Sequence, residues 1–194
     1  TIVVATSDNG MPFPRAKSNN YEFGTRVPLA IRWGNKLSGG LEVDAIVSLS
    51  DLAPTILGAA GLPIPNKMTG RSLMPFLEGK NEPTTASDFT FTITGFERHI
   101  VNARENNATS PSRAIHTQNF MLIHNFAADR WPAGDPPLFR DIDSTSPSKN
   151  QVLGNSTFLE LAGGKRPEIE LYDTRADPYQ MNNLAGIPEY DRVV

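Results

Sequence analysis

Hydrophobic residues in this 194-residue chain form short runs whose spacing predicts strands or helices. Ile2–Ala5 is continuously apolar and largely β-branched, which is typical of a strand buried on both faces of a parallel sheet. Val27–Trp33 and Val43–Val47 predict two more strands. Ser48–Gly61 has apolar residues at helical spacing, a capping residue near its start and a glycine at its end. Gly70–Gly79 predicts a second, shorter helix, so strands and helices are interspersed here as in an α/β domain.

The second half of the chain has a different pattern. Four segments there have the composition of strands: Phe89–Thr94, Arg113–Thr117, Met121–Phe126 and Glu170–Asp173. Phe89–Thr94 alternates aromatic or aliphatic residues with threonine, which predicts one buried face. Gln118–Asn119 is expected to form a hairpin turn between the second and third strands. Phe158–Ala162 predicts a helix. These segments together predict a small antiparallel sheet.

A polar, proline-containing stretch, Asn81–Ser87, separates the two patterns. We therefore expect residues 1–85 to be the C-terminal portion of an α/β domain and residues 86–194 to be an antiparallel-sheet α+β subdomain. Because the chain begins inside a strand pattern, we expect it to be a fragment of a longer protein. With 39% hydrophobic residues and a net charge of −3, the composition gives no sign of nucleic-acid binding, and no apolar run is long enough to span a membrane. Disulfides and thiolate metal sites are excluded because there is no cysteine.

Polar residues follow the first predicted strand immediately. Ser7, Asp8, Asn9 and Gly10 lie just beyond its carboxyl end, where open α/β sheets bind ligands. Carboxylate and amide oxygens are ligands that Ca²⁺ or Mg²⁺ prefers, and glycine permits a sharp turn. Lys17, nine residues after Asp8, offers a point charge to a sulfate or phosphate group. An Asp-Asn-Gly sequence is also typical of an ordinary turn, so both interpretations stay open.

A longer sequence pattern begins with this strand, continues through Lys17 and ends with Tyr21-Glu22-Phe23-Gly24-Thr25-Arg26-Val27-Pro28. It resembles the sulfatase family of the alkaline-phosphatase superfamily, and the Met-Pro-Phe-Pro turn after Gly10 resembles its heparan N-sulfatase (sulfamidase) branch. Phe23 stands where the family has a glycine. The segment Asp177–Ala185 also resembles the family's ending, with Gln180 where glutamate is common. The resemblance covers nearly the whole chain and implies the C-terminal part of an alkaline-phosphatase-like α/β/α sulfatase domain.

The resemblance implies the following roles. Asp8 and Asn9 would bind an active-site Ca²⁺, and Lys17 would contact the sulfate and act in catalysis. The formylglycine nucleophile would come from a Cys/Ser-x-Pro-x-Arg motif upstream. Ser110–Arg113 has neither the spacing nor the place of that motif, so we expect the fragment alone to be inactive. The implied partners are a sulfated glycan, N-sulfoglucosamine among the candidates, and the rest of the sulfatase chain, in a periplasmic, secreted or lysosomal protein.

Other residues are weaker candidates. Arg98 and His99 occur where bacterial sulfamidase-like proteins are expected to have a similar Arg-His sequence, and they could bind substrate at the rim of the site. A loop histidine without a role is the alternative. His116 and His124 alternate with apolar residues in strands, which is typical of structural or solvent-facing histidines. Trp131, beside a proline, could stack on a sugar or simply pack.

Two other functions remain open from the sequence. One is a phosphoester or phosphonate hydrolase of the same superfamily, which would have other residues upstream. The other is a non-catalytic glycan-binding or degenerate sulfatase domain. The sequence does not decide the sugar or the position of the sulfate.

Overall fold

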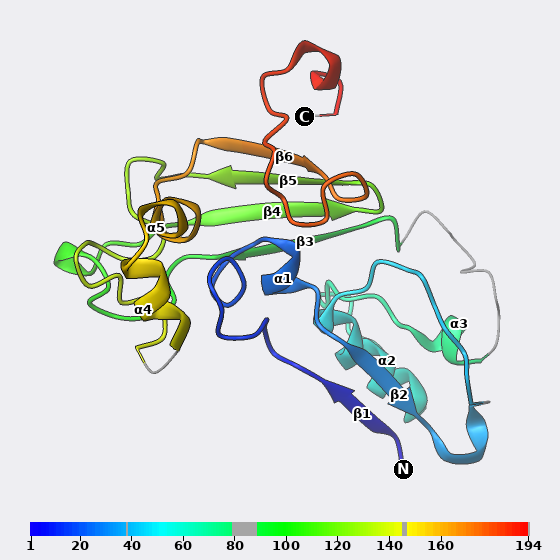
Figure 1. Cartoon of the computed structure of the whole chain (residues 1–194). Coiled ribbons are helices and arrows are strands. Elements are labelled where there is room, and N and C mark those ends of the chain that lie inside the picture. The colour runs from blue at the N-terminus through cyan, green and yellow to red at the C-terminus, as the bar shows by residue number, and fades with distance from the viewer. Residues whose placement is uncertain (38, 79–88, 145–146, 194) are drawn as a thin grey trace. The chain divides into compact units, whose positions relative to one another are not determined.

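The computed structural model describes residues 1–37, 39–78, 89–144 and 147–193 (Figure 1). Its contacts divide the chain into two compact units: Thr1–Ala5 with Leu29–Thr92, and Thr6–Pro28 with Ile93–Val194. The loop segment with Asp8, Asn9 and Lys17 therefore belongs with the second unit. The predicted boundary between residues 85 and 86 lies outside the described residues and stays a prediction. Among the described helices, none has the length and hydropathy that crossing a bilayer requires.

The first unit contains a two-stranded sheet and short helices. Its elements are β1 (Val3–Thr6, which ends in the second unit), β2 (Leu29–Arg32), η1 (Gly34–Lys36), η2 (Leu49–Asp51), α2 (Leu52–Ala59) and α3 (Met74–Leu77). The first two predicted strands and both helices are confirmed. The predicted strand Val43–Val47 is wrong, because Ile46 donates one backbone hydrogen bond to Phe89 but no strand ladder forms. The predicted burial of the first strand is also wrong: Val3 is 57% exposed, since β2 is the only described strand that pairs with β1.

A buried carboxylate organises the helices of the first unit. Asp51 is 1% exposed, and its carboxylate accepts hydrogen bonds from the backbone N–H groups of Ser48 (2.8 Å) and Arg71 (2.7 Å). Ser48 and Asp51 form a capping box around η2, which leads directly into α2. The capping side chain is therefore Ser48 and neither of the two candidates that the sequence offers, Asp51 and Ser50; Asp51 also joins the helix start to the segment before α3.

The second unit contains a four-stranded sheet. Its order is β3 (Phe91–Phe96), β4 (Ser112–Thr117), β5 (Phe120–Asn125) and β6 (Ile169–Asp173), as Figure 1 shows. The β4–β5 and β5–β6 pairs are antiparallel, which confirms the predicted hairpin and sheet. The other elements are α1 (Glu22–Thr25), η4 (Glu105–Asn107), α4 (Pro147–Leu153), α5 (Ser156–Gly163) and η5 (Pro188–Tyr190). Of these, the sequence predicted only the helix at α5.

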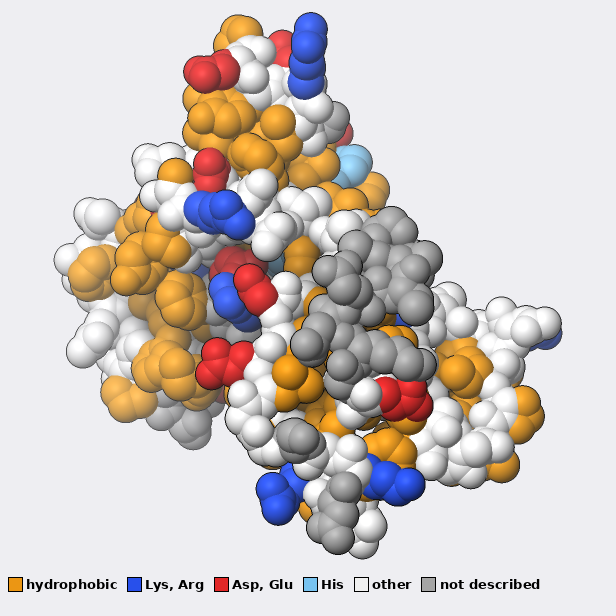
Figure 2. All heavy atoms as spheres, turned by 90° about the vertical axis from the view of Figure 1, so that its right-hand side faces the viewer, with side chains coloured by type: hydrophobic (Ala, Val, Ile, Leu, Met, Phe, Trp, Pro, Cys, Tyr) orange, Lys and Arg blue, Asp and Glu red, His pale blue; other side chains and the backbone are white. Residues whose placement is uncertain are grey.

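The alternating pattern of β3 predicts one buried face and leaves open which one. Phe91 and Ile93 lie on the exposed face, at 45% and 62% exposure. The half-buried positions are Thr92, Thr94 and Phe96, and Thr94 hydrogen-bonds with two polar side chains. On the face shown in Figure 2, hydrophobic side chains are interspersed with charged ones. Alternation thus locates a strand without deciding which face is covered.

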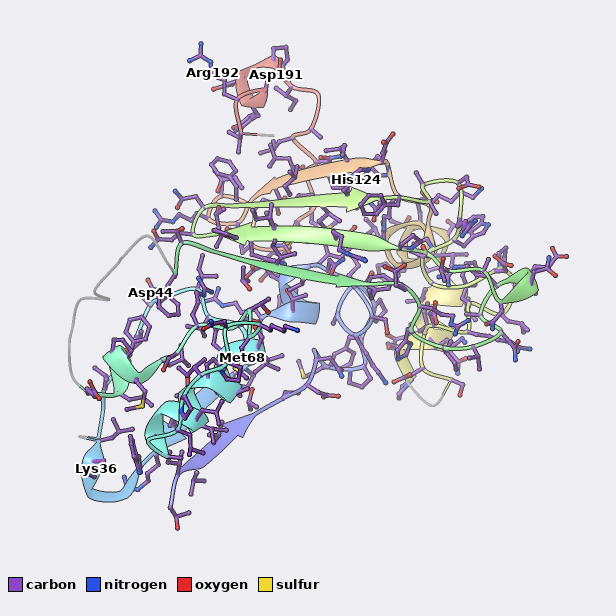
Figure 3. The ribbon with its side chains drawn as sticks, turned by 180° about the vertical axis from the view of Figure 1, so that it is seen from behind. Lys36, Asp44, Met68, His124, Asp191 and Arg192 are labelled. Atoms are coloured by element: carbon purple, nitrogen blue, oxygen red, sulfur yellow. The ribbon has the colours of Figure 1, made fainter. Side chains whose placement is uncertain are left out.

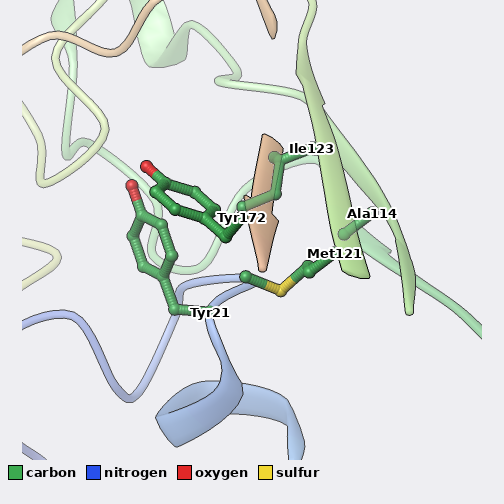
Figure 4. Close-up of a cluster of buried hydrophobic side chains, with 5 residues drawn as sticks. All are labelled: Tyr21, Ala114, Met121, Ile123 and Tyr172. Atoms are coloured by element: carbon green, nitrogen blue, oxygen red, sulfur yellow. The ribbon is translucent and has the colours of Figure 1, made fainter. Parts of the chain in front are cut away.

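A buried carboxylate also sits beside the hydrophobic cluster of the second unit. Figure 4 shows Tyr21 and Tyr172 with their hydroxyl groups on the same side of the cluster. Both hydroxyls donate to Glu170, at 2.8 and 2.5 Å, and Asn125 donates to its other oxygen at 2.7 Å. Burial raises the pKa of Tyr21 to about 12, so this hydroxyl keeps the proton that it donates. The network joins the segment before α1 to β5 and β6.

Gln180 is a second buried link, and it reaches the first residue of α1. It is 1% exposed; its amide oxygen accepts from the Glu22 N–H at 3.2 Å, and its amide nitrogen donates to Pro178 at 2.7 Å. We expect Gln180→Ala to lower the free energy of unfolding by about 2 kcal/mol, because both backbone groups lose a buried partner. Urea denaturation would measure this. Gln180→Glu should also destabilise, because a carboxylate cannot donate to Pro178; equal stability of all three proteins would contradict the assignment.

Candidate functional site

The loop after β1 is seated on the backbone of α1. Ser7 Oγ donates to the Asn9 carbonyl at 2.8 Å, and the Gly10 N–H donates to the Gly24 carbonyl at 3.0 Å. A Cβ on Gly10 would collide with the backbone oxygen of Phe23, so only glycine fits this close approach. The loop therefore turns at Gly10 and presents Asp8 and Asn9 from a fixed backbone.

The turn that follows places Lys17. The N–H of Lys17 donates to the Met11 carbonyl at 3.2 Å, which closes the Pro-Phe-Pro turn back onto the loop. Arg15 has a positive φ of 60° and stacks on Tyr21, with its guanidinium carbon 3.9 Å from the ring centroid. It also donates to the backbone oxygens of Leu161 and Gln180. The backbone bond to Met11 and the contacts of Arg15 therefore fix the turn, and the turn fixes the backbone position of Lys17.

Lys17 pairs with an acidic residue that the sequence analysis did not single out. Its Nζ lies 2.9 Å from Asp143 Oδ2, and both side chains are 31% exposed. The two residues, with Asp141, line a small pocket of about 20 Å³, which has room for about one water molecule. Two basic residues, Lys17 and Arg15, and two carboxylates thus line one pocket beneath the Pro-Phe-Pro turn.

His99 approaches the same pocket through Asp141. Asp141 is 8% exposed; one of its oxygens lies 3.7 Å from His99 Nδ1, and the other accepts from the buried Arg104 at 2.9 Å. Arg98 turns elsewhere: it is exposed and donates to the Asn107 carbonyl at 3.4 Å. The structure therefore places His99 and Lys17 on two carboxylates of one short segment and leaves Arg98 apart.

The sequence-predicted residues form two groups in this structure. Lys17 and His99 each pair with an aspartate of the pocket, whereas no hydrogen bond or ion pair within the described ranges joins Asp8 or Asn9 to this group. The sequence analysis missed both aspartates. The sequence does show two acidic residues separated by one position in a loop. It does not show which cations they pair with, because those cations are distant in the sequence.

Trp131, the other loop candidate, has a packing role in the structure. Its ring lies edge to face against Phe139, with the ring centroids 5.8 Å apart. Of the two interpretations that the sequence left open for this tryptophan, the structure therefore favours packing.

The loop after β1 fits the beginning of a hard-cation site. In the described part of the chain, neither the Asp8 carboxylate nor the Asn9 side-chain amide makes a hydrogen bond or ion pair, so their oxygens are available to a metal. Asp8 is exposed and Asn9 is half-buried. The described residues contain no cluster of three or more His, Cys, Asp or Glu side chains placed to hold a metal. Because Ca²⁺ takes six to eight oxygen ligands, these two residues can supply only part of a site.

Glu22, on the helix that seats the loop, has a pH-dependent role in stability. The adjacent His116 imidazole lowers the pKa of Glu22 below its ordinary value of 4.5. A lowered pKa means that ionised Glu22 stabilises the fold above about pH 4.5, and that this contribution is lost as the pH falls through the folded-state pKa.

We therefore expect Glu22→Gln to destabilise the chain by up to about 1 kcal/mol near pH 6, the upper end of what a partly exposed ion pair contributes. The difference should disappear in more acidic solution, where Glu22 is protonated in both states. Urea denaturation of both proteins between pH 3 and 7 would measure it. A difference that stays constant with pH would contradict the role of the ionised carboxylate.

The sequence of this chain is similar to known proteins over its whole length. A family model described as "N-sulphoglucosamine sulphohydrolase, C-terminal" matches residues 16–136. The human N-sulphoglucosamine sulphohydrolase is 33% identical to this chain over 218 residues, which include 100% of this chain and 39% of that protein. The chain therefore spans about two fifths of the length of this relative.

Two solved structures share the fold. One is of a protein in complex with its substrate D-glucosamine-2-N,6-O-disulfate; it has a TM-score of 0.61 and 26% identity, and the match covers 100% of this chain and 31% of that one. The other is a phosphonate monoester hydrolase from Silicibacter pomeroyi, with a TM-score of 0.62, 22% identity and coverage of 100% and 32%. A putative sulfatase from Bacteroides thetaiotaomicron and a 2-O GAG sulfatase also match, each with a TM-score of 0.65, and they confirm the predicted mixed α/β fold class with its antiparallel C-terminal sheet.

Proposed function

Because the chain belongs to the family described as N-sulphoglucosamine sulphohydrolase, C-terminal, we propose that it is the C-terminal part of a glycan sulfatase. The proposed reaction is the hydrolysis of sulfate esters or sulfamates, with N-sulfoglucosamine as the first candidate substrate. The observation that carries this proposal is the 33% identity with the human enzyme over 100% of this chain. The phosphonate hydrolase shares only the fold at 22% identity, which gives weaker support for that alternative.

In this proposal the pocket beneath the Pro-Phe-Pro turn faces the substrate. Lys17 would neutralise charge that develops on the sulfate oxygens during the reaction, which is preorganised electrostatic stabilisation. His99, one third exposed and next to the buried Asp141, would contact the sugar or its sulfate from the rim. Arg98 would join them only if its exposed side chain turns from the Asn107 carbonyl. The nucleophile would come from the rest of the sulfatase chain.

Asp8 and Asn9 would hold a calcium ion together with ligands from outside this chain. Their side-chain oxygens make no hydrogen bond within the described residues, and the loop backbone is held by Ser7 and by the contact between Gly10 and Gly24. Calcium bound there would neutralise negative charge on the sulfate group. Location in the periplasm, in the lysosome or outside the cell is part of the same proposal.

The test uses the full-length protein that contains this chain. Release of inorganic sulfate is measured from N-sulfoglucosamine and from glucosamine 6-sulfate, and hydrolysis of a phenyl phosphonate monoester is measured in parallel. We expect sulfate release that is lost in a chelator and restored by Ca²⁺. Faster hydrolysis of the phosphonate would instead support the phosphonate hydrolase, and no hydrolysis of any of the three would support a binding or degenerate domain.

A further inference from the structure

A buried polar network lies between α1 and the sheet of the second unit. Glu22 Oε1 on α1 is 3.7 Å from His116 Nδ1 on β4, and the His116 side chain is 9% exposed. The other ring nitrogen, Nε2, lies 2.9 Å from Thr94 Oγ1 on β3. Asn20, just before α1, accepts from Thr94 at 3.1 Å and donates to Ser112 on β4 at 3.0 Å.

The donors and acceptors of this network indicate which groups accept hydrogen bonds from the His116 imidazole. Because Asn20 donates through its amide nitrogen to Ser112, its oxygen is the group that accepts the Thr94 hydroxyl proton. Thr94 Oγ1 is then an acceptor for His116, so Nε2 carries a proton. Nδ1 faces the Glu22 carboxylate, which is an acceptor for a second proton. The two ring nitrogens of His116 thus face one acceptor on β3 and one on α1.

The same helix carries the loop with the proposed metal ligands. Gly24, two residues after Glu22, accepts the Gly10 N–H at 3.0 Å. Gly24 also packs against the backbone oxygens of Ala16 and Asn19, so a Cβ there would collide with both. Movement of α1 would therefore be transmitted to Gly10 through backbone contacts and not through flexible side chains.

We propose that Glu22 and His116 are positioning residues that hold α1 against the sheet and thereby fix the Asp8–Asn9 loop in the geometry that binds a divalent cation. This proposal rests on the proposed function, because it takes Asp8 and Asn9 as cation ligands. The pair acts on the loop through the backbone contact between Gly24 and Gly10. Residues that orient metal ligands typically change metal affinity by 10- to 100-fold when they are replaced.

The experiment measures the Ca²⁺ dissociation constant of the full-length protein by titration calorimetry, together with its Tm. Glu22→Gln removes the carboxylate and His116→Gln removes the imidazole, and each keeps a polar side chain of similar size. We expect each to raise the dissociation constant about tenfold. The double variant should raise it no further than the stronger single variant, because both act through one pair.

His124→Gln is the matched control. His124, labelled on β5 in Figure 3, also faces a glutamate, with Nε2 3.5 Å from Glu168 Oε1. This pair is exposed, Glu168 precedes β6, and neither residue takes part in the contacts between Gly10 and Gly24 that seat the loop on α1. Its replacement should leave the Ca²⁺ dissociation constant unchanged. If it weakens Ca²⁺ binding as much as His116→Gln does, the effect is one of general stability and the proposal is overturned.

Asp8→Asn separates failure of this proposal from failure of the proposed function. If Asp8→Asn weakens Ca²⁺ binding while Glu22→Gln and His116→Gln do not, the loop binds the metal but is not positioned by this pair, and the proposal is overturned alone. If Asp8→Asn leaves Ca²⁺ binding unchanged, the metal assignment fails and this proposal fails with it. Should His116→Gln not fold, Glu22→Gln provides the same comparison.

Discussion

Replacement of Lys17 by alanine in the full-length protein is expected to lower kcat for sulfate release by about 10²–10³-fold. The expected loss is large because a preorganised cation beside a developing negative charge is most effective in a site shielded from water. KM should change less than kcat if Lys17 acts mainly in the transition state. Steady-state kinetics with N-sulfoglucosamine would measure both values.

The ion pair with Asp143 provides the control for this prediction. In the structure, Lys17 Nζ is 2.9 Å from Asp143 Oδ2, so Lys17→Ala removes a salt bridge as well as a cation. Asp143→Asn removes the same salt bridge and keeps the cation. We expect Asp143→Asn to retain most of kcat; if it lowers kcat as much as Lys17→Ala, the role of Lys17 is to pair with Asp143 and the catalytic assignment is wrong. Both side chains are 31% exposed, so the pair itself contributes little to stability.

Replacement of Glu170 by alanine should lower the free energy of unfolding by about 4 kcal/mol. Glu170 is 2% exposed and accepts from the hydroxyls of Tyr21 and Tyr172 and from Asn125. Its removal leaves three donors without this acceptor in the interior, and each such loss costs about 1–3 kcal/mol, partly relieved by entering water. Urea denaturation followed by circular dichroism would measure the change.

Two further variants test whether this effect comes from the buried network. Glu168→Ala, two residues earlier, removes a carboxylate that is 73% exposed and should change stability by less than about 0.5 kcal/mol. Glu170→Gln keeps the shape but brings an amide into a site that is surrounded by donors, so we expect an intermediate loss. Similar losses for Glu168→Ala and Glu170→Ala would contradict the assigned role of the network.

The candidate site was only partly accessible to sequence reasoning. Asp8 and Asn9 could be selected because the strand before them and Gly10 after them are local signals. The partners Asp141 and Asp143 could not, because the Lys17–Asp143 pair joins positions 126 residues apart and no local pattern reports such a distance. His116 shows the same limit, because its sequence neighbours mark it only as a strand histidine. Its proposed positioning role depends on its contacts with Glu22 on α1 and Thr94 on β3, which only the folded chain brings together.

The sequence by itself determined the local elements whose stabilising interactions are also local. The hairpin from β4 to β5, the strand β6 and the helix α2 follow from periodicity and turn residues, because short-range spacing decides which backbone hydrogen bonds can form. Only the tertiary structure decided which face each element covers. Ile93 is exposed while Thr94 faces a polar network, and Val43–Val47 forms no strand despite its composition. The physical reason is that burial and strand pairing depend on neighbours brought from distant parts of the chain, whereas periodicity records only that one side of an element differs from the other.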